Sequence, residues 1–163
     1  MDINVKVKKV RENAIIPSQG TSGSAGFDLT VAAFLDNNGN ELNCDAVCLN
    51  SNHTIVIRCA TGLAMEIPER YCLKILPRSG LAFKECITVV NAPGLIDSDY
   101  RGEIVVGLIR HHSINTTKDT YINIGDRIAQ GVFEKYEKPN FIEVAELSNT
   151  ERGEGGFGST GSN

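Results

Sequence analysis

This chain has no apolar run close to the ~18 residues that a membrane-spanning helix needs. Its opening segment, MDINVKVKKV, lacks the apolar centre of a signal peptide. We therefore expect an intracellular protein, cytoplasmic or nuclear, that does not bind membranes. The net charge of -4 argues against direct nucleic-acid binding, because non-specific binders of nucleic acid are usually basic. A small polyanionic ligand is compatible with this charge if basic side chains gather locally.

The cysteines lack the pattern of a disulfide scaffold. There are five of them, an odd number, and none forms a Cys-x-x-Cys pair. Cys44 and Cys48 lie near His53, which leaves a metal site as an alternative. Buried or half-buried thiols in a reducing compartment are the preferred interpretation.

Helical periodicity is almost absent, and short runs rich in Val, Ile and Thr take its place. The runs cover residues 3–7, 54–58, 71–76, 87–90, 104–110 and 128–133. Most are bounded by Gly, Pro, Asn or Asp, a pattern typical of strands joined by turns. We predict an all-β fold, a jelly-roll-like sandwich or a β-barrel, with one short helix over residues 78–85. The polar, Asn-rich residues 36–52 are interpreted as a long hairpin or surface loop.

The C-terminal part of the chain differs from the rest. A chain of 163 residues is long enough for one hydrophobic core and short for two. We assign residues 1–138 to that core and residues 139–163 to an arm that begins at Pro139. The arm has one apolar segment, residues 141–147, followed by a glycine-rich tail that is expected to be mobile. A proline before a detached strand favours packing of that strand on a neighbouring subunit.

Two motifs in the first half of the chain carry candidate binding residues. In SAGFDL, Asp28 follows a bend of small residues and is either a ligand or an ordinary turn acid. PRSGLA places Arg78, Ser79 and Gly80 where the short helix is expected to begin. Free N–H groups at a helix start, a hydroxyl and a guanidinium together favour an anion. The alternative is a capped helix start without a ligand.

A third motif, NAPGLIDSDYRGEI, combines acids, an aromatic residue and a base around a hairpin. Asp97 and Asp99 are two residues apart, so on extended backbone they would share a face. The same residues also suit a tight turn with no ligand. Tyr100 and Arg101 follow directly. The combination indicates a pocket for a small ligand, with a structural hairpin as the alternative.

The last two motifs are GDRIAQGVF and RGEGGFGSTG. On a regular strand, Arg127, Ala129 and Gly131 would share one face, and Asp126, Ile128 and Gln130 the other. Gln130 carries a donor suited to a phosphate. The glycine-rich stretch is no P-loop, because no Gly-Lys-Ser/Thr occurs, but its N–H groups and the hydroxyls of Ser159 and Thr160 suit phosphates. Phe157 is an aromatic side chain that such an arm can close over a flat base; a disordered tail is the alternative.

Together the five segments resemble the motifs of the trimeric dUTPase family. SAGFDL, PRSGLA, GLIDSDYRGE, GDRIAQ and RGEGGFGSTG occur in the family's order and span nearly the whole chain. The resemblance implies a jelly-roll-like homotrimer with three active sites, each built from motifs on all three chains, and a C-terminal arm exchanged between subunits. It also implies hydrolysis of dUTP to dUMP and pyrophosphate, which limits uracil incorporation into DNA and supplies dUMP for dTTP synthesis.

The resemblance assigns a role to residues in each motif. Asp97 matches the acid that activates water for attack on the α-phosphorus, and Asp28 matches an acid that contacts Mg²⁺ through water. The positions that match substrate contacts are Arg78, Ser79, Gly80, Asn91, Leu95, Ile96, Tyr100, Val105, Gln130, Arg152, Phe157, Gly158, Ser159 and Thr160. Among these, the hairpin backbone and Asn91 match the reader of the uracil edge. Tyr100 matches the tyrosine that packs under deoxyribose and excludes a 2′-hydroxyl.

The departures from the family pattern are few, and two rival functions fit the sequence less well. Phe27 and Thr30 stand where the family often has tyrosines, and the segment of residues 36–52 is longer than in compact members. A dCTP deaminase on the same fold would need an extra glutamate and serine and a reopened base pocket. A non-catalytic nucleotide sensor would be expected to have lost Asp97, Arg152 or Phe157, and all three are present.

Overall fold

The computed structural model describes residues 3–49, 56–111 and 118–156. In this part the chain forms one helix, α1 (Ser79–Glu85), and short strands. The strands are β1 (Lys6–Lys9), β2 (Phe27–Thr30), β3 (Ala33–Leu35), β4 (Ala46–Leu49), β5 (Val56–Ala60), β6 (Leu63–Glu66), β7 (Tyr71–Pro77), β8 (Ile87–Val89), β9 (Gly94–Ile96), β10 (Val105–Arg110), β11 (Thr120–Asn123) and β12 (Arg127–Lys135). The prediction of a mostly β chain with one short helix is confirmed.

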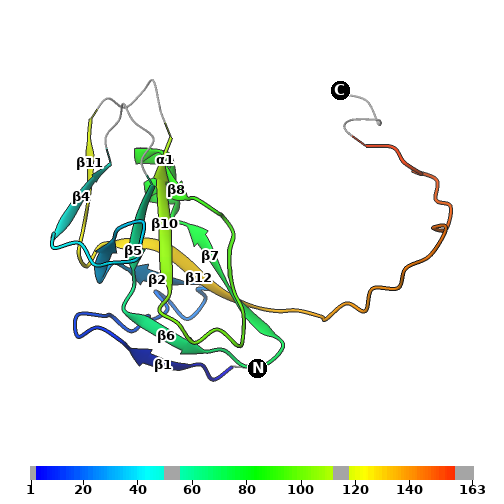
Figure 1. Cartoon of the computed structure of the whole chain (residues 1–163), viewed down its shortest axis with the longest axis horizontal. Coiled ribbons are helices and arrows are strands. Elements are labelled where there is room, and N and C mark those ends of the chain that lie inside the picture. The colour runs from blue at the N-terminus through cyan, green and yellow to red at the C-terminus, as the bar shows by residue number, and fades with distance from the viewer. Residues whose placement is uncertain (1–2, 50–55, 112–117, 157–163) are drawn as a thin grey trace.

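The strands form antiparallel sheets that wrap around one core (Figure 1). Two four-stranded sheets dominate, with orders β3-β5-β10-β8 and β2-β12-β7-β9. Two-stranded pairs, β1-β6 and β11-β4, complete the body. Sequence neighbours such as β7 and β8 lie in different sheets, so the chain crosses between layers repeatedly. This crossing is what brings distant motifs into one sheet.

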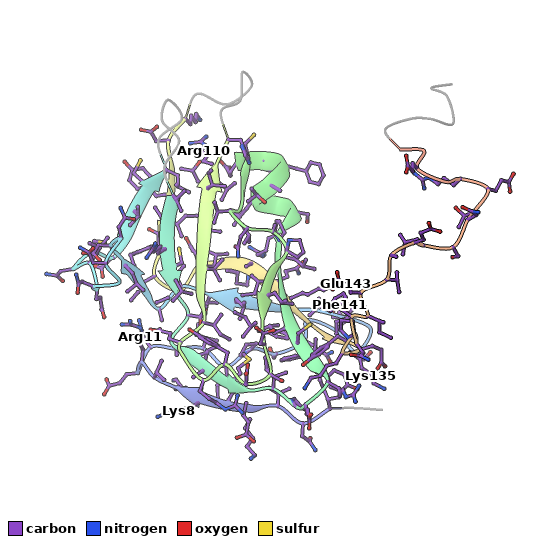
Figure 2. The ribbon with its side chains drawn as sticks, turned by 45° about the vertical axis from the view of Figure 1, so that its right-hand side comes forward. Lys8, Arg11, Arg110, Lys135, Phe141 and Glu143 are labelled. Carbon is purple, nitrogen blue, oxygen red and sulfur yellow. The ribbon has the colours of Figure 1, made fainter. Side chains whose placement is uncertain are left out.

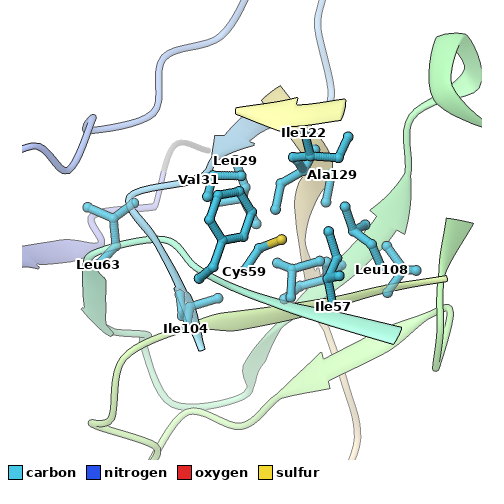
Figure 3. Close-up of a cluster of buried hydrophobic side chains, with 14 of the residues drawn as sticks. Leu29, Val31, Ile57, Cys59, Leu63, Ile104, Leu108, Ile122 and Ala129 are labelled. Carbon is cyan, nitrogen blue, oxygen red and sulfur yellow. The ribbon is translucent and has the colours of Figure 1, made fainter. Parts of the chain in front are cut away.

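The core consists of β-branched and leucine side chains from both large sheets (Figure 3). Period-two alternation places them inside: on β10, Val106 and Leu108 are buried, whereas Val105 on the same strand is exposed. Cys59 lies among these side chains, and burial raises the pKa of its thiol to about 12. All five cysteines are unpaired, as the sequence predicted.

Residues 36–52 were interpreted as a long hairpin or a surface loop; the chain turns back on β3 as a hairpin, with Leu35 opposite Glu41, but the segment also contains a strand that neither interpretation included. Asp36 caps a tight turn, where its carboxylate accepts the N–H groups of Asn38 and Asn40. The chain then forms β4, which pairs with β11 over four residues. The strand was not predicted because AVCL is short and is flanked by polar residues, and its partner lies more than 70 positions away in the sequence.

The C-terminal arm leaves the body after β12 and forms no strand within its described part, residues 139–156 (Figure 1). Its apolar side chains are exposed, with Phe141 at 90% and Leu147 at 86%. The part of the chain that the structure describes contains no helix long and apolar enough to cross a membrane.

Candidate active site

Four of the five motifs meet in a single sheet, β2-β12-β7-β9. Asp28 lies on β2, and Gln130 lies directly opposite it on β12. Arg78 follows the last residue of β7, and Asp97 follows the last residue of β9. Motifs far apart in the sequence therefore lie on adjacent strands.

Asp28 is the centre of a cluster of charges. Its carboxylate accepts a hydrogen bond from Nε of Arg78 at 3.1 Å and one from Nη1 of Arg127 at 3.0 Å. Arg78 also donates from Nη1 to the carbonyl oxygen of Arg127 at 2.7 Å. Asp28 and Arg78 are each 25% exposed. The cluster thus holds two cations and one anion at the surface, and its net positive charge favours a polyanion.

Arg127 was not predicted as a member of this cluster. The register of β12 against β2 shifts between Arg127 and Ala129, the mark of a β-bulge. Both Ile128 and Ala129 are consequently buried, while Arg127 and Gln130 are exposed. The predicted alternation of faces along this strand is therefore wrong at the bulge. The bulge is set by pairing with β2, which the sequence of β12 alone does not reveal.

Helix α1 places Ser79 and Gly80 directly after Arg78, and both residues are exposed. The helix buries none of its residues completely; Leu81 packs against the core, and polar contacts hold the other end of the helix. There, Arg110 donates to the carbonyl oxygens of Glu85 and of Leu49, and Thr120 Oγ1 donates to the Glu85 carboxylate at 2.7 Å. Figure 2 shows Arg110 at this end of the helix. The β4-β11 pair thus anchors the helix that carries the second motif.

The third motif forms β9 and a turn that follows it. Gly94 pairs with Ile75, and a Cβ at Gly94 would lie 3.3 Å from the Cβ of Ile75, a tight contact that favours a small residue there. The peptide bond before Pro93 is cis. Asp97 is exposed, and its carbonyl oxygen accepts the Tyr100 N–H. The side chain of Asp97 therefore faces solvent, where a substrate can reach it.

Asp97 and Arg78 lie at opposite ends of β7. Ile96 pairs with Leu73, so Asp97 is level with Cys72, whereas Arg78 lies beyond the other end of the strand. At about 3.3 Å per strand residue, the separation is on the order of 20 Å. The structure brings Asp28, Arg78 and Gln130 together at one end, and Asn91, Leu95, Ile96, Asp97 and Tyr100 along β9 and its turn. Within one chain the two groups form separate half-sites.

The fifth motif is only partly described. Arg152 is exposed and donates from Nε to the carbonyl oxygen of Gly155 at 2.8 Å, within a turn of the arm. The described part of the arm, residues 139–156, extends away from the body of the protein (Figure 1). Phe157, Gly158, Ser159 and Thr160 lie outside the described residues, as does His53.

The residues present fit a magnesium ion held through water. Both oxygens of Asp28 are engaged by guanidinium groups, yet its carboxylate stays partly exposed and can accept a further bond from a water molecule. Mg²⁺ usually keeps several of its waters and takes substrate phosphates as ligands. Among the described residues, no three His, Cys, Asp or Glu side chains are grouped as a metal site.

Comparison with known proteins agrees with the motif pattern. The family model of dUTPase matches residues 12–161. The deoxyuridine 5′-triphosphate nucleotidohydrolase of Nautilia profundicola is 45% identical over 159 residues, which cover 98% of this chain and 99% of the relative. The corresponding protein of a Hydrogenobaculum species is 44% identical over 155 residues, covering 95% and 96%. This chain belongs to the dUTPase family.

Solved structures of the family share the fold. A mutant dUTPase of Staphylococcus bacteriophage 80alpha with dUpNHpp superposes with a TM-score of 0.77 at 26% identity, covering 98% of this chain and 99% of the other. A mutant dUTPase from phage phi11 of S. aureus, described with a structural Mg(II) ion, has a TM-score of 0.69 at 23% identity, covering 90% and 100%. The second likeness supports the fold alone.

Proposed function

We propose that this chain hydrolyses dUTP to dUMP and pyrophosphate with Asp97 as the general base. The observation that carries the proposal is the placement of four motifs in one sheet as two half-sites, one with an exposed carboxylate on the hairpin and the other with two arginines at Asp28. Relatives of nearly the same length bear the name of this activity. We also propose an intracellular location, which suits five unpaired cysteines.

The chemistry requires one proton transfer and one displacement. The Asp97 carboxylate takes a proton from a water molecule as that water attacks the α-phosphorus. The bond between the α-phosphorus and the bridging oxygen breaks, and pyrophosphate leaves with the electron pair. A positioned carboxylate base typically contributes about 10²–10⁴-fold, so charge stabilisation along the triphosphate must supply the rest.

Cations and backbone donors hold the triphosphate. Arg78, with the Ser79 hydroxyl and the free N–H groups at the start of α1, contacts the α- and β-phosphates, and Gln130 adds a further donor. Arg152 clamps the γ-phosphate, and the Ser159 and Thr160 hydroxyls support the phosphate tail. When bound to the phosphates, Mg²⁺ would supply neutralising charge, and Asp28 would hold it through water. Asp28 also holds Arg78 and Arg127 in place before substrate arrives.

The hairpin half-site reads the nucleoside. The backbone around Asn91 pairs with the uracil edge, and the tight hairpin leaves no room for a 5-methyl group or a purine. Tyr100 packs under the deoxyribose, while Leu95, Ile96 and Val105 complete the apolar wall. Leu95 is 58% exposed on this chain, which suits a wall that a ligand covers. Phe157, with Gly158 beside it, closes over the uracil ring.

The protein assembles as a homotrimer with shared active sites. The separation of Asp97 from Arg78 supports this proposal, because both must reach one α-phosphate and a general base acts within about 3 Å of its proton. The outward face of β10 supports it as well. Ile109 and the opposing Val56 form an apolar stripe there, extended by Val90 against Gly107. Such a stripe suits contact with a second copy.

The arm is exchanged between subunits and docks in an apolar groove. The groove measures about 610 Å³, and β1 on its border is an edge strand with only β6 as a partner among the described strands. Its apolar lining includes Val5, Val7, Ile16, Phe27, Met65 and Phe133. In residues 141–147, the exposed side chains of Phe141, Ile142, Val144 and Leu147 of a second copy match this lining in chemistry.

Mixing two inactive variants tests the shared site. We expect Asp97→Asn and Arg152→Ala chains to be nearly inactive alone and to regain turnover when unfolded together and refolded at equal amounts. In randomly mixed trimers, about a quarter of the sites would combine an intact Asp97 with an intact arm from another chain. If each arm closed on its own chain, no site would be intact, and the absence of recovery would refute the exchange.

A substrate panel tests the activity itself. We expect pyrophosphate release from dUTP to exceed that from dCTP, dTTP and UTP by at least about 100-fold, and to fall sharply when Mg²⁺ is removed with a chelator and return when it is restored. Ammonia release from dCTP would instead identify a deaminase. Tight dUTP binding without pyrophosphate release would identify a non-catalytic sensor.

A further inference from the structure

The turn that carries Asp97 and Tyr100 ends at a strongly fixed residue, Glu103. The carboxylate of Glu103 accepts two hydrogen bonds from Arg11, from Nε at 2.7 Å and from Nη2 at 3.1 Å. The same carboxylate accepts the N–H of Gly62 at 2.8 Å. A bidentate ion pair of this kind fixes the orientation of the Glu103 carboxylate as well as its distance from Arg11. Arg11 lies in the segment just after β1 (Figure 2).

The backbone on the C-terminal side of Glu103 is also fixed. Ile104 donates its N–H to the carbonyl oxygen of Leu63 at 2.8 Å, and its own carbonyl accepts both the N–H and the hydroxyl of Thr61. Ile104 and Thr61 are buried. Glu103 therefore stands between a buried ladder of hydrogen bonds and an exposed turn, at the position where the turn's orientation is determined.

Tyr100 takes its position from this fixed point. Its hydroxyl donates to the carbonyl oxygen of Glu103 at 3.0 Å. Its ring lies against Gly102, where an added Cβ would come within 2.4 Å of the hydroxyl oxygen. The side chain of Tyr100 is 44% exposed, so core packing alone does not hold it. The contacts within the turn, and the anchor at Glu103, hold the ring in place.

We propose that Arg11 and Glu103 are positioning residues that set the selectivity of this protein for deoxyribose over ribose by fixing the ring of Tyr100. The inference rests on the proposed role of Tyr100 beneath the sugar. A ring that excludes one hydroxyl by contact must be placed to within a fraction of an ångström. The Arg11–Glu103 pair provides that placement from a segment that does not touch the nucleotide.

The pair is shielded enough to exert this control. Arg11 and Glu103 are 22% and 20% exposed, whereas the surface pair Lys6–Glu66 is 79% and 49% exposed. Partly buried ion pairs are screened less by solvent than exposed ones. Arg11 also binds Glu41, which lies beyond β3 and pairs with Leu35.

The test compares two substrates in one preparation. For Arg11→Ala and Glu103→Ala we expect the ratio of kcat/KM for dUTP to kcat/KM for UTP to fall by about tenfold or more. The main cause of this fall should be a higher kcat/KM for UTP. A variant that is merely less stable loses active protein for both substrates alike, so the ratio cancels that loss. A purely structural role for the pair would therefore leave the ratio unchanged.

Matched variants complete the design. Glu41→Ala removes the other partner of Arg11 and should keep the parental ratio, whereas Arg11→Lys, which lacks the guanidinium fork, should not. If Glu103→Ala folds poorly, Glu103→Gln keeps an acceptor for Gly62 and should show an intermediate ratio. If Tyr100→Ala lowers the ratio but the Arg11 and Glu103 variants do not, the positioning role is refuted. If Tyr100→Ala also leaves the ratio unchanged, the role of Tyr100 itself is wrong.

Discussion

The Asp97→Asn variant is expected to bind dUTP with close to parental affinity and to lose turnover by about 10²–10⁴-fold. The carboxamide has nearly the same size and shape as the carboxylate, so the hairpin keeps its conformation. It cannot take a proton from water, however, because an amide is not basic at neutral pH. Asp97 is exposed, and its hydrogen bond among the described residues is the one that its backbone carbonyl accepts from the Tyr100 N–H. The substitution therefore removes the general base and leaves the packing of the hairpin unchanged.

The measurement for this variant separates binding from turnover. Titration with a non-hydrolysable dUTP analogue gives the affinity, and pyrophosphate release gives kcat. Asp99→Asn is the matched control, because it replaces the other carboxylate of the same turn with a carboxamide. This variant should keep most of the parental kcat. Near-parental turnover by Asp97→Asn would show that another group activates the water.

Removing every residue after Thr150 is expected to reduce dUTP turnover by about 100-fold or more while the oligomer stays assembled. The truncation deletes the Arg152 guanidinium and the Phe157 ring. One charge-assisted hydrogen bond is worth about 1.5–3 kcal/mol, and one stacked base about 1–3 kcal/mol. Residues 151–156 make hydrogen bonds only within the arm among the described contacts, so the body should fold without them.

Two measurements decide this prediction. Sedimentation or size-exclusion chromatography reports the assembly, and pyrophosphate release at saturating and at low dUTP separates kcat from KM. A chain ending after Gly161 keeps the whole motif and serves as the control. Unchanged activity in the shorter chain would refute the closing role of the arm. Loss of the oligomer would show instead that residues after Thr150 belong to the interface.

The sequence predicted the motifs better than the contacts among them. The helix at Arg78 and the strand nature of the motif-four segment follow from local turn chemistry and β-branched runs, which are properties of neighbouring residues. The approach of Arg127 to Asp28 depends on a bulge created by pairing with β2. The ion pair of Arg11 with Glu103 joins residues that are 92 positions apart in the sequence. No local pattern in the sequence specifies either contact.

The same limit explains the unpredicted strands. β9 is three residues long and contains a glycine, and β4 stands in a polar segment. β9 forms by pairing with the longer strand β7, and β4 forms by pairing with β11, which has the same length as β4. These strands depend on pairing with a partner that is distant in the sequence, so the residues of each strand alone do not predict it. The roles of the individual site residues remain predictions until the variants above are measured.

The distance between the two half-sites on each chain has a genetic consequence. Each subunit would contribute the hairpin with Asp97 to one active site, the arginine cluster to a second and the arm to a third. One defective subunit could therefore inactivate several active sites of the trimer. A chain with inactivating substitutions in all three parts would inactivate every active site of a trimer that contains it. Such an allele would be dominant over a normal one in the same cell, although each lesion by itself is a simple loss of function.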